Sequence, residues 1–340
     1  MIEVAIIGGG PAGSYCAYTL AQNGFQPIIF DHSHPREKPC GGLVTPLTQE
    51  MFSFLSELSV DHSERDRIYF VSPNGKQVCI RSRKRKVRCF SRLKLDQSLV
   101  NMAVKKGAEL VKEKVVALGK NANFWGIKTA SKSYYAKTLI GADGVNSLVR
   151  KNTIGPLNKK DLGFCFGYFV RGLEKEEITI RFLSQRKGYM WTIPREDHTC
   201  VGIGSSELSY SHGLRRELDV FIEQNHPHIE RISEWASLIP NVKDVKTFCT
   251  PLAGHSWIII GDAAGHVDPI NGEGIMYALL DGELAAQAII DNDPRLFDDL
   301  WREAYGRNLF THIRLRKWLY TRQVLELYCQ FLKLRNRLRF

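Results

Sequence analysis

The first thirty-one residues constrain the fold more than any other stretch of the sequence. An apolar run from Ile2 to Ile7 leads directly into Gly8-Gly9-Gly10-Pro11-Ala12-Gly13. Such a run is typical of a strand that is buried on both faces of a parallel sheet. We expect a helix from Pro11 to Asn23, which Gly24 ends, and a second strand from Gln26 to Phe30. The chain is therefore predicted to begin as strand, glycine turn, helix and strand.

The glycine spacing indicates what this unit binds. Gly8, Gly10 and Gly13 have the G-x-G-x-x-G spacing, which supplies a tight turn, a close approach to pyrophosphate and close packing of helix on strand. The amino end of the helix offers N–H groups and a positive dipole to an anion. Asp31 follows the second strand, where a carboxylate can accept both ribose hydroxyls of an adenosine. A purely structural turn is the alternative, but the whole context indicates a bound dinucleotide.

Composition sets the class and the compartment. At 340 residues the chain is long enough for two lobes, and its 44% hydrophobic and 24% charged residues are ordinary for a globular protein. The first strand begins at Ile2, and no uncharged stretch is long enough to span a bilayer. We therefore expect a cytoplasmic protein. The eight cysteines include no C-x-x-C pair, so we expect reduced, mostly buried thiols and no metal site.

The net charge of +11 is concentrated in two segments. Residues 302–339 carry ten Lys or Arg against two Glu, and the run Arg81-Ser82-Arg83-Lys84-Arg85-Lys86-Val87-Arg88 holds most of the remaining excess. This run has neither interleaved aromatics nor a nucleic-acid motif, so we expect a solvated edge or an anion-contacting surface, and no nucleic acid. In the tail, apolar residues recur at helical spacing between the cations. They are Leu315, Trp318, Leu319, Leu325, Tyr328, Phe331 and Leu332. This pattern fits an interfacial helix on anionic lipid, or equally a helix packed on the body of the protein.

The remaining elements follow from local patterns. A hairpin is expected over residues 68–87, with its turn at Ser72-Pro73-Asn74-Gly75, and a helix over 92–106. Strands are expected at 108–118, 124–129, 134–138 and 256–260, and residues 164–204 are mostly β. Helices are expected at 214–223, 229–238 and 275–291, and the rest of the chain is helical and basic.

Two further glycine motifs follow the first in chain order. Gly141-Ala142-Asp143-Gly144 is followed by Arg150, and Gly261-Asp262 is followed by Pro269, Gly272 and Gly274. With these three motifs nearly the whole chain resembles the flavoprotein superfamily typified by p-hydroxybenzoate hydroxylase, and within it the geranylgeranyl reductases. Nicotinamide-type Rossmann enzymes lack the last two motifs. The resemblance therefore implies that the dinucleotide is FAD.

The resemblance also assigns roles to single residues. It implies that Gly8, Gly10, Ala12 and Gly13 hold the pyrophosphate, and Asp31 the adenosine ribose. Arg92 is similar to the arginine that reaches the phosphate or ribityl region of the flavin, and Val115 to the position beside adenine. Asp262 looks like the acid on the ribityl chain, and Gly274 with Ile275 like the helix start that faces the isoalloxazine. A helix amino end suits that place because a reduced flavin is anionic near N1 and C2=O.

Two segments favour the reductase branch. Cys40-Gly41-Gly42-Leu43 resembles the cysteine-glycine loop that these reductases place near the flavin. Tyr189-Met190-Trp191-Thr192-Ile193-Pro194 resembles their Y-x-W-x-F-P motif, which lines the lipid tunnel, although Ile193 replaces phenylalanine and Arg186 stands where the family has proline, alanine or tryptophan. These departures bring the segment nearer the W-x-W-x-I-P of flavin halogenases. The run Gly272-Glu273-Gly274-Ile275, with Tyr277-Ala278 after it, looks like the reductase version.

The reaction that this resemblance implies is the reduction of isolated double bonds in a geranylgeranyl chain. Such an alkene must be held against the flavin, kept dry and given a proton. Tyr189 and Trp191 alternate on a strand and so share a face, which suits holding, although ordinary sheet packing is the alternative. Cys40, Tyr189 and His266 are the candidate proton donors. We take Cys40, Tyr189 and Trp191 as the predicted catalytic residues, and NADPH or a ferredoxin as the external electron donor.

The predicted architecture is α/β. A Rossmann-like FAD-binding domain of the glutathione reductase type comprises residues 1–67, 88–155 and 250–290, an antiparallel β-sheet substrate domain comprises 68–87 and 156–249, and 291–340 form a basic helical region. Two other functions stay open: an FAD-dependent monooxygenase or halogenase acting on an aromatic or polyketide-like substrate, and a non-catalytic protein that binds prenylated partners.

Overall fold

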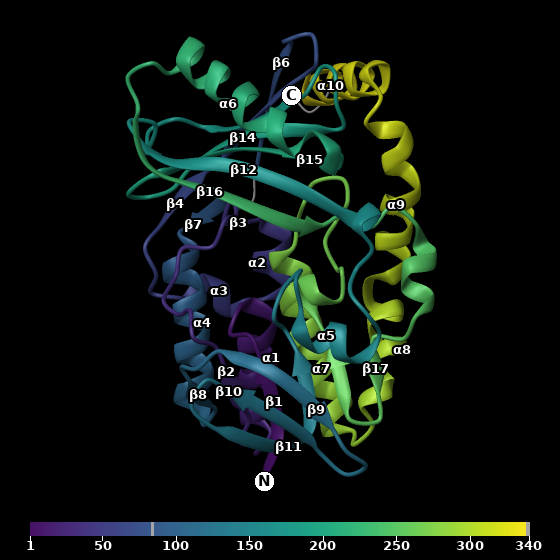
Figure 1. Ribbon diagram of the computed structural model, residues 1–340. Helices are drawn as coiled ribbons and strands as arrows, with labels where there is room; N and C mark the ends of the chain where they lie inside the picture. Colours follow the sequence, from purple (N-terminus) through teal and green to yellow (C-terminus); the bar gives the residue numbers. More distant parts are fainter. Residues whose placement is uncertain (83–84, 338–340) are drawn as a thin grey trace. The chain divides into compact units, whose positions relative to one another are not determined.

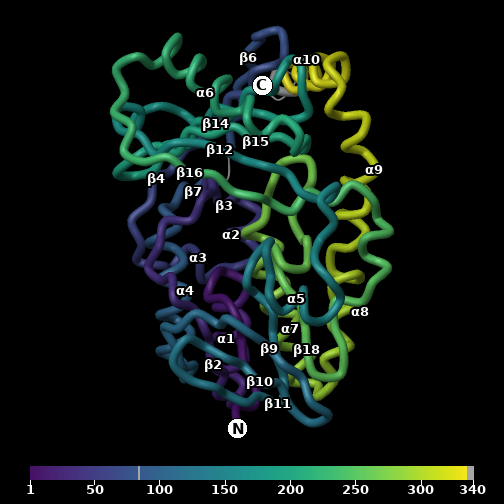
Figure 2. The backbone as a smooth tube through the Cα atoms, in the orientation of Figure 1, coloured from purple at the N-terminus to yellow at the C-terminus, as the bar shows by residue number. Residues whose placement is uncertain are grey.

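The computed structural model describes residues 1–82 and 85–337, which form two compact units (Figure 1). Unit 1 comprises Met1–Arg36, Leu93–Asp161 and Pro240–Arg314. Unit 2 comprises Glu37–Arg92, Leu162–Ile239 and Leu315–Phe340. Each unit is thus built from three separate segments, and the chain can be followed from one segment to the next in Figure 2.

A parallel sheet forms the centre of unit 1. Strand β1 (Ile2–Ile7) pairs in parallel with β2 (Ile28–Phe30) on one side and with β11 (Ser133–Gly141) on the other. The sheet order is β17-β18-β11-β1-β2-β8, and a hairpin of β9 and β10 pairs with β11. The bounds of these outer strands are Ala253–Gly254 for β17, Trp257–Ile259 for β18, Glu109–Val111 for β8, Val115–Lys120 for β9 and Trp125–Thr129 for β10. The single strand expected over 108–118 is therefore two strands, but the α/β prediction is confirmed.

Helices cover this sheet. The two that pack most closely are α1 (Pro11–Gln22) and α7 (Ile275–Ile290). A Cβ added at Gly282 of α7 would lie 2.6 Å from the carbonyl oxygen of Ala12 and 2.9 Å from the amide nitrogen of Cys16. The other helices are α4 (Arg92–Lys106), α5 (Leu148–Thr153), α8 (Phe297–Trp301) and α9 (Arg307–Leu319). Since residues 4–6 of β1 are completely buried, the unbroken apolar run at the start of the chain is explained.

Unit 2 contains a seven-stranded sheet in the order β16-β12-β15-β14-β13-β5-β6. Their bounds are Glu230–Pro240, Leu162–Arg171, Thr199–Ser205, Gly188–Pro194, Ile178–Phe182, Arg67–Val71 and Gln77–Arg81, respectively. From β12 to β13 neighbouring strands are antiparallel, whereas β13 and β5 are parallel. Helix α6 (Ser211–Asn225) buries Leu214, Leu218 and Ile222 on one face of the sheet. The expected hairpin is confirmed as β5 and β6, which are antiparallel.

A smaller sheet completes unit 2 and explains its boundaries. Strand β7 (Val87–Phe90) lies between β3 (Leu43–Val44) and β4 (His62–Arg65), and the short helices α2 (Pro46–Met51) and α3 (Phe54–Glu57) follow β3. These pairings place residues 37–67 and 88–92 in unit 2. The domain boundaries predicted from the sequence assign the same residues to the FAD-binding domain. Helix α10 (Arg322–Arg337) also belongs to unit 2, and residues 338–340 of the predicted basic helical region lie outside the described residues.

The prediction of a helix at residues 229–238 is wrong, because this segment forms strand β16 (Glu230–Pro240). The strand lies beside β12 and places the indole of Trp235 over Gly167, where a Cβ would overlap the ring. The apolar spacing of this segment is compatible with a helix, but pairing with a neighbouring strand outweighs local propensity. The helices expected at 92–106, 214–223 and 275–291 are confirmed as α4, α6 and α7.

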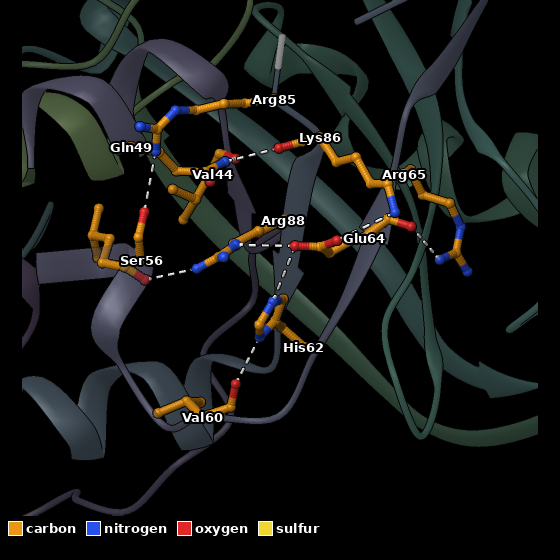
Figure 3. Close-up of polar contacts among 11 residues, drawn as sticks. Val44, Gln49, Ser56, Val60, His62, Glu64, Arg65, Arg85, Lys86 and Arg88 are labelled. Atoms are coloured by element: carbon orange, nitrogen blue, oxygen red, sulfur yellow. Dashed lines mark hydrogen bonds and ion pairs between the residues drawn. The ribbon is translucent and has the colours of Figure 1, made fainter. Parts of the chain in front are cut away.

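Much of the basic run has partners inside unit 2 (Figure 3). Lys86 and Arg88 lie 3.4 and 3.3 Å from the carboxylate of Glu64 on β4. Arg81 donates to Asp66 at 2.7 Å, and Arg83 and Lys84 lie outside the described residues. These contacts favour the solvated edge over an anion-contacting surface. The absence of a nucleic-acid partner stays a prediction.

Two general expectations can be compared with the described part of the chain. Among residues 1–82 and 85–337, no helix is both long and apolar enough to cross a membrane. The eight cysteines are all described, and none forms a disulfide. Five of them are buried, as expected for reduced thiols.

The close packing of Trp191 generates a stability prediction. A Cβ at Gly202 would overlap the Trp191 indole, whereas one at Gly119 on β9 would meet no atom of the described residues within 4 Å. We expect Gly202→Ala to lower the free energy of unfolding by about 1–3 kcal/mol, because the overpacked ring must move. Gly119→Ala is the control and should change it by less than about 0.5 kcal/mol. Urea unfolding of both variants measures the difference, and equal stability would contradict the packing described.

Candidate functional site

The first glycine turn of unit 1 is fixed by backbone packing. Gly8 has a φ of +103°, and a Cβ there would overlap the carbonyl oxygen of Ala142. Its amide donates to the carbonyl oxygen of Phe30 at 3.0 Å, which joins the turn to β2. A Cβ on Gly13 would overlap the carbonyl oxygen of Gly8. Gly8 and Gly13 are therefore required by the fold itself.

Gly10 differs from its two neighbours in the motif. A Cβ built on it would meet nothing within 4 Å in the part of the chain that the structure describes. Gly10 is the N-cap of α1, and no described side chain caps this helix end. The N–H groups of the first turn, including those of Ala12 and Gly13, have no acceptor within the helix. Open space in front of these donors fits a pyrophosphate, so the residues present suit the phosphate end of FAD.

Asp31 lies at the carboxyl end of β2 and ties the following loop to the glycine turn. Its Oδ2 accepts from the Gly9 amide at 2.7 Å, and its Oδ1 accepts from the Ser33 amide at 2.8 Å. Burial raises the pKa of Asp31, but the adjacent His34 ring and the hydrogen bonds from Ser33 and Gly9 outweigh burial and hold that pKa below its usual range. The carboxylate is therefore ionised and can accept from a ribose hydroxyl. The His34 ring, 3.4 Å from Asp31, is buried beside it and was not predicted as a site residue.

The three glycine motifs meet around the amino end of α1. Gly8 and Gly13 both face Ala142 of the second motif. Gly261 of the third motif has a φ of +62°, and a Cβ there would lie 3.1 Å from the Cβ of Ala12. Motifs that are more than 100 residues apart in the sequence thus form one surface of unit 1.

Arg150 links the second motif to the third. Its side chain is buried, and its Nη1 donates to the carbonyl oxygen of Ala263 at 3.1 Å. Burial lowers the pKa of Arg150 to about 10, and the charge of Asp161 opposes this change. Ser147 caps α5, the helix that carries Arg150, by accepting from the Arg150 amide at 2.8 Å, and Asp143 accepts from the amide of Leu148 at 2.5 Å. The second motif therefore supports the third glycine turn.

Asp262 and the start of α7 lie side by side. A Cβ on Gly274 would be 3.6 Å from the Asp262 Oδ1. Gly274 is the N-cap of α7, no side chain among the described residues caps it, and Ile275 is the buried first residue of the helix. The structure thus brings Asp262 next to an uncapped helix end, while the roles of Asp262, Gly274 and Ile275 toward the ribityl chain and the isoalloxazine stay predictions. Val115 begins β9 and packs half-buried against the core of the sheet.

A buried polar cluster lies beneath the third glycine turn. The Asp281 Oδ2 accepts from the Gly261 amide at 2.7 Å and from His266 Nδ1 at 2.8 Å. The Tyr305 hydroxyl hydrogen-bonds to both Asp281 and His266. The His266 side chain is fully buried, with the ring of Trp301 4.6 Å away between centroids. His266 therefore positions the turn, which favours a satisfied loop histidine over a proton donor.

Asp268 arranges the loop between the third turn and α7. Its Oδ1 accepts from the amides of Ile270 and Asn271 at 2.8 and 3.2 Å, and its Oδ2 lies 2.5 Å from His312 Nδ1 on α9. The sequence reasoning missed Asp268, Asp281, Tyr305 and His312. Asp268 carries the one local signal, since it stands between the predicted glycine turn and Pro269.

In unit 2, the cysteine-glycine loop lies against β14. A Cβ on Gly41 would overlap the Ile193 side chain, and one on Gly42, which has a φ of +72°, would overlap the carbonyl oxygen of Phe90. The Gly42 amide donates to the Cys40 sulfur at 3.3 Å. The two motifs that favoured the reductase branch are therefore in contact.

An ion pair between the buried Arg195 and the partly exposed Glu37 holds this loop in place. Arg195, only 1% exposed, donates to the carbonyl oxygen of Cys40 at 2.6 Å and to Glu37 Oε1 at 2.7 Å. Glu37 also accepts from Ser91 and from the amide of Arg92, the buried first residue of α4. Burial raises the pKa of Glu37, but the charge of Arg195 and these hydrogen bonds outweigh burial and lower the pKa overall. Glu37 and Arg195 were not predicted, although Arg195 directly follows the aromatic motif.

Tyr189 and Trp191 share one face of β14, with ring centroids 5.8 Å apart. Trp191 is buried, stacks on Trp235 at 5.9 Å and donates to the Cys200 sulfur at 3.4 Å. Tyr189 is half-buried at the edge of the same cluster. Sheet packing thus accounts for the position of Trp191, while the catalytic roles of Cys40, Tyr189 and Trp191 stay predictions.

Comparison with known proteins identifies the family. A family model described as an FAD binding domain matches residues 1–291. The chain belongs to this family of FAD-binding proteins. It is 27% identical to a digeranylgeranylglycerophospholipid reductase of Methanocaldococcus jannaschii, over 93% of this chain and 86% of that protein.

Two solved structures share the fold. A geranylgeranyl bacteriochlorophyll reductase-like protein of Thermoplasma acidophilum matches with a TM-score of 0.83 and 22% identity, covering 97% of this chain and 91% of the other. A flavin-dependent brominase matches with a TM-score of 0.77 and 17% identity, covering 98% and 94%. The predicted membership of the flavoprotein superfamily is confirmed, and the chain is an FAD-dependent oxidoreductase.

Within the described residues, no group of three or more His, Cys, Asp or Glu could hold a metal ion.

The open space at Gly10 predicts that one variant will separate folding from cofactor binding. Gly10→Ala should leave the urea midpoint of the FAD-free protein unchanged, because its Cβ meets no described atom within 4 Å. We expect it to weaken FAD binding by about tenfold or more, because the pyrophosphate must approach this backbone closely. Titration of the FAD-free protein with FAD, followed by flavin fluorescence, measures this. Gly13→Ala is the comparison and should destabilise the FAD-free fold. Full FAD affinity in Gly10→Ala would show that this turn does not hold the pyrophosphate.

The Glu37–Arg195 pair predicts a pH dependence. Because the pKa of Glu37 is lowered on folding, its stabilisation is fully present above the ordinary glutamate pKa of about 4.3 and is lost as the pH falls through the folded-state value. Glu37→Gln should reduce the free energy of unfolding at pH 7 by about 3 kcal/mol, since Arg195 stays buried without its anion. The difference in the free energy of unfolding between Glu37→Gln and wild type should be smaller at pH 3.5 than at pH 7.

Urea unfolding at the two pH values measures this effect. Glu223→Gln, at an exposed position on α6, is the control and should follow wild type at both. If Glu37→Gln lowers the free energy of unfolding by the same amount at both pH values, the ionised pair does not hold the loop.

Proposed function

We propose that the protein reduces isolated carbon–carbon double bonds of an isoprenoid chain, such as a geranylgeranyl chain of a lipid. The observation that carries this proposal is the contact of the cysteine-glycine loop with the aromatic strand, Gly41 against Ile193. Both motifs resemble those of geranylgeranyl reductases, and they pack together within unit 2. The likeness to a digeranylgeranylglycerophospholipid reductase over 93% of the chain adds support.

The residues of unit 1 fit the needs of a reduced flavin. When bound, FAD supplies the hydride, and each reduced bond also takes one proton. The uncapped amino end of α7 at Gly274 and Ile275 offers positive charge to the electron-rich edge of the ring. Asp281 holds the Gly261 amide and Arg150 the Ala263 carbonyl, so the turn that carries Asp262 is fixed before the cofactor binds. The two electrons come from an external donor, for which NADPH or a ferredoxin is proposed.

The residues of unit 2 suit an apolar substrate and the delivery of a proton. Tyr189 lies half-buried against the buried Trp191, and an aromatic group there tolerates an alkyl chain and developing positive charge. Cys40 is the proposed proton donor. On giving up its proton the sulfur becomes an anion, and the Gly42 N–H that already points at it would stabilise that charge. Arg195 holds the Cys40 carbonyl and so fixes the loop.

A flavin-dependent monooxygenase or halogenase is the second candidate. The brominase shares the fold at 17% identity, and Ile193 stands where the halogenase pattern has isoleucine. The non-catalytic prenyl-binding protein is disfavoured, because the chain belongs to a family of FAD-binding enzymes.

Product analysis tests the proposed reaction. FAD-loaded protein is reduced chemically under anaerobic conditions and incubated with a digeranylgeranylglyceryl phospholipid. We expect mass spectrometry to show hydrogen gained in pairs, with no oxygen added. An unchanged lipid, together with aerobic NADPH oxidation and oxygen or halogen inserted into an aromatic acceptor, would favour the second candidate.

The role of Cys40 has its own test within that assay. Cys40→Ser should lower the rate of double-bond reduction by about a hundredfold, which is typical for loss of a general acid. It should leave the flavin absorption spectrum unchanged. Cys249→Ser, at an exposed cysteine of unit 1, is the control. An unaltered rate in Cys40→Ser would remove the thiol from the mechanism but leave the reductase proposal standing.

A further inference from the structure

Helix α10 has two apolar faces, and one of them belongs to the core of unit 2. Leu325, Cys329 and Leu332 are buried, and they pack with Val78 of β6 and its neighbours on the sheet. This face accounts for the position of the helix. It also confirms, for these residues, the expectation of a helix packed on the body of the protein.

The second face points to solvent. Leu327, Phe331 and Leu334 are 62%, 59% and 56% exposed. At about 100° per residue they lie roughly half a turn from the buried face. The end of α9 adds Trp318, 73% exposed, and Leu315, 51% exposed. We call these five residues the α9–α10 apolar surface. Several exposed side chains of this size on two consecutive helices are typical of an interaction site.

Cations accompany this surface. Lys317, Arg322 and Lys333 are exposed on the same two helices. Glu326, the one acid in the sequence of α10, accepts a hydrogen bond from the Asn74 amide at 2.7 Å and is only partly exposed. The surface therefore combines large apolar side chains with an excess of positive charge.

We propose that the α9–α10 apolar surface docks on a bilayer that contains anionic phospholipid. Leucine and phenylalanine side chains can enter the acyl boundary, Trp318 suits the headgroup level, and the cations pair with lipid phosphates. A second copy of the chain is a poorer occupant, because a two-fold contact would bring the same lysines together. The proposal does not depend on the reductase chemistry.

Vesicle flotation of the FAD-loaded chain tests this. The vesicles contain phosphatidylcholine alone, or phosphatidylcholine with about one-third phosphatidylglycerol, and no isoprenoid substrate. We expect binding to be at least tenfold stronger to the anionic vesicles and to weaken as salt rises. The triple variant Leu327→Ser, Phe331→Ser, Leu334→Ser should lose at least tenfold, with an unchanged unfolding midpoint because these side chains are exposed.

Two further variants sharpen the result. Lys317→Gln with Lys333→Gln should lower the preference for anionic vesicles and keep the apolar contribution. Val220→Ser, at a 42% exposed position on α6, is the control and should bind as wild type does. Equal vesicle binding by the triple variant and wild type would overturn the proposal. A wild-type dimer in solution that the triple variant converts to monomer would also overturn it, in favour of a second copy. Because no substrate is present, neither result bears on the reductase proposal.

Discussion

The architecture of unit 1 depends on backbone atoms that touch at the amino end of α1. Gly8 and Gly13 approach each other and Ala142 so closely that no Cβ fits, and Gly282 brings α7 onto the carbonyl of Ala12 in the same way. These contacts bring three distant segments of the chain to one place. Gly10 stands among them with open space before it. The same crowding that fixes the fold thus leaves one position where a ligand can approach the backbone.

The sequence predicted the parts of this site that are encoded locally. Strand, turn, helix and acid follow one another within 31 residues, so spacing alone predicts the strand, helix and second strand that the structure contains. The long-range hydrogen bonds that hold these turns and loops could not be predicted from the sequence, for a physical reason. Asp281 reaches back 20 residues to the Gly261 amide, and Arg195 crosses 158 residues to Glu37. Each partner is an ordinary charged residue in its own segment, and its role exists only once tertiary contacts form.

The errors have the same origin. Residues 229–238 carry apolar side chains at a spacing compatible with a helix, but they form a strand because β12 offers an open edge and Gly167 leaves room for Trp235. His266 follows a glycine turn, where the sequence offers it as a candidate proton donor but favours a satisfied loop histidine. It is buried because Trp301 and Tyr305, from a helical segment far along the chain, close over it. Where an element's neighbours are distant in sequence, local pattern is a weak guide.

In the sheet of unit 2, some side chains are used in core packing and others are less buried. This difference bears on the choice between a reductase and a halogenase. One face is covered by α6 and needs no further partner. On the other, Trp191 is committed to Trp235 and Cys200, so it shapes the surface more than it offers a reactive group. Tyr189 and the Cys40 loop lie at the margin of that aromatic cluster and are less buried. Since a reductase-like protein and a brominase share the fold, the scaffold does not distinguish the two classes, and the proposal of a reductase depends on these less buried groups.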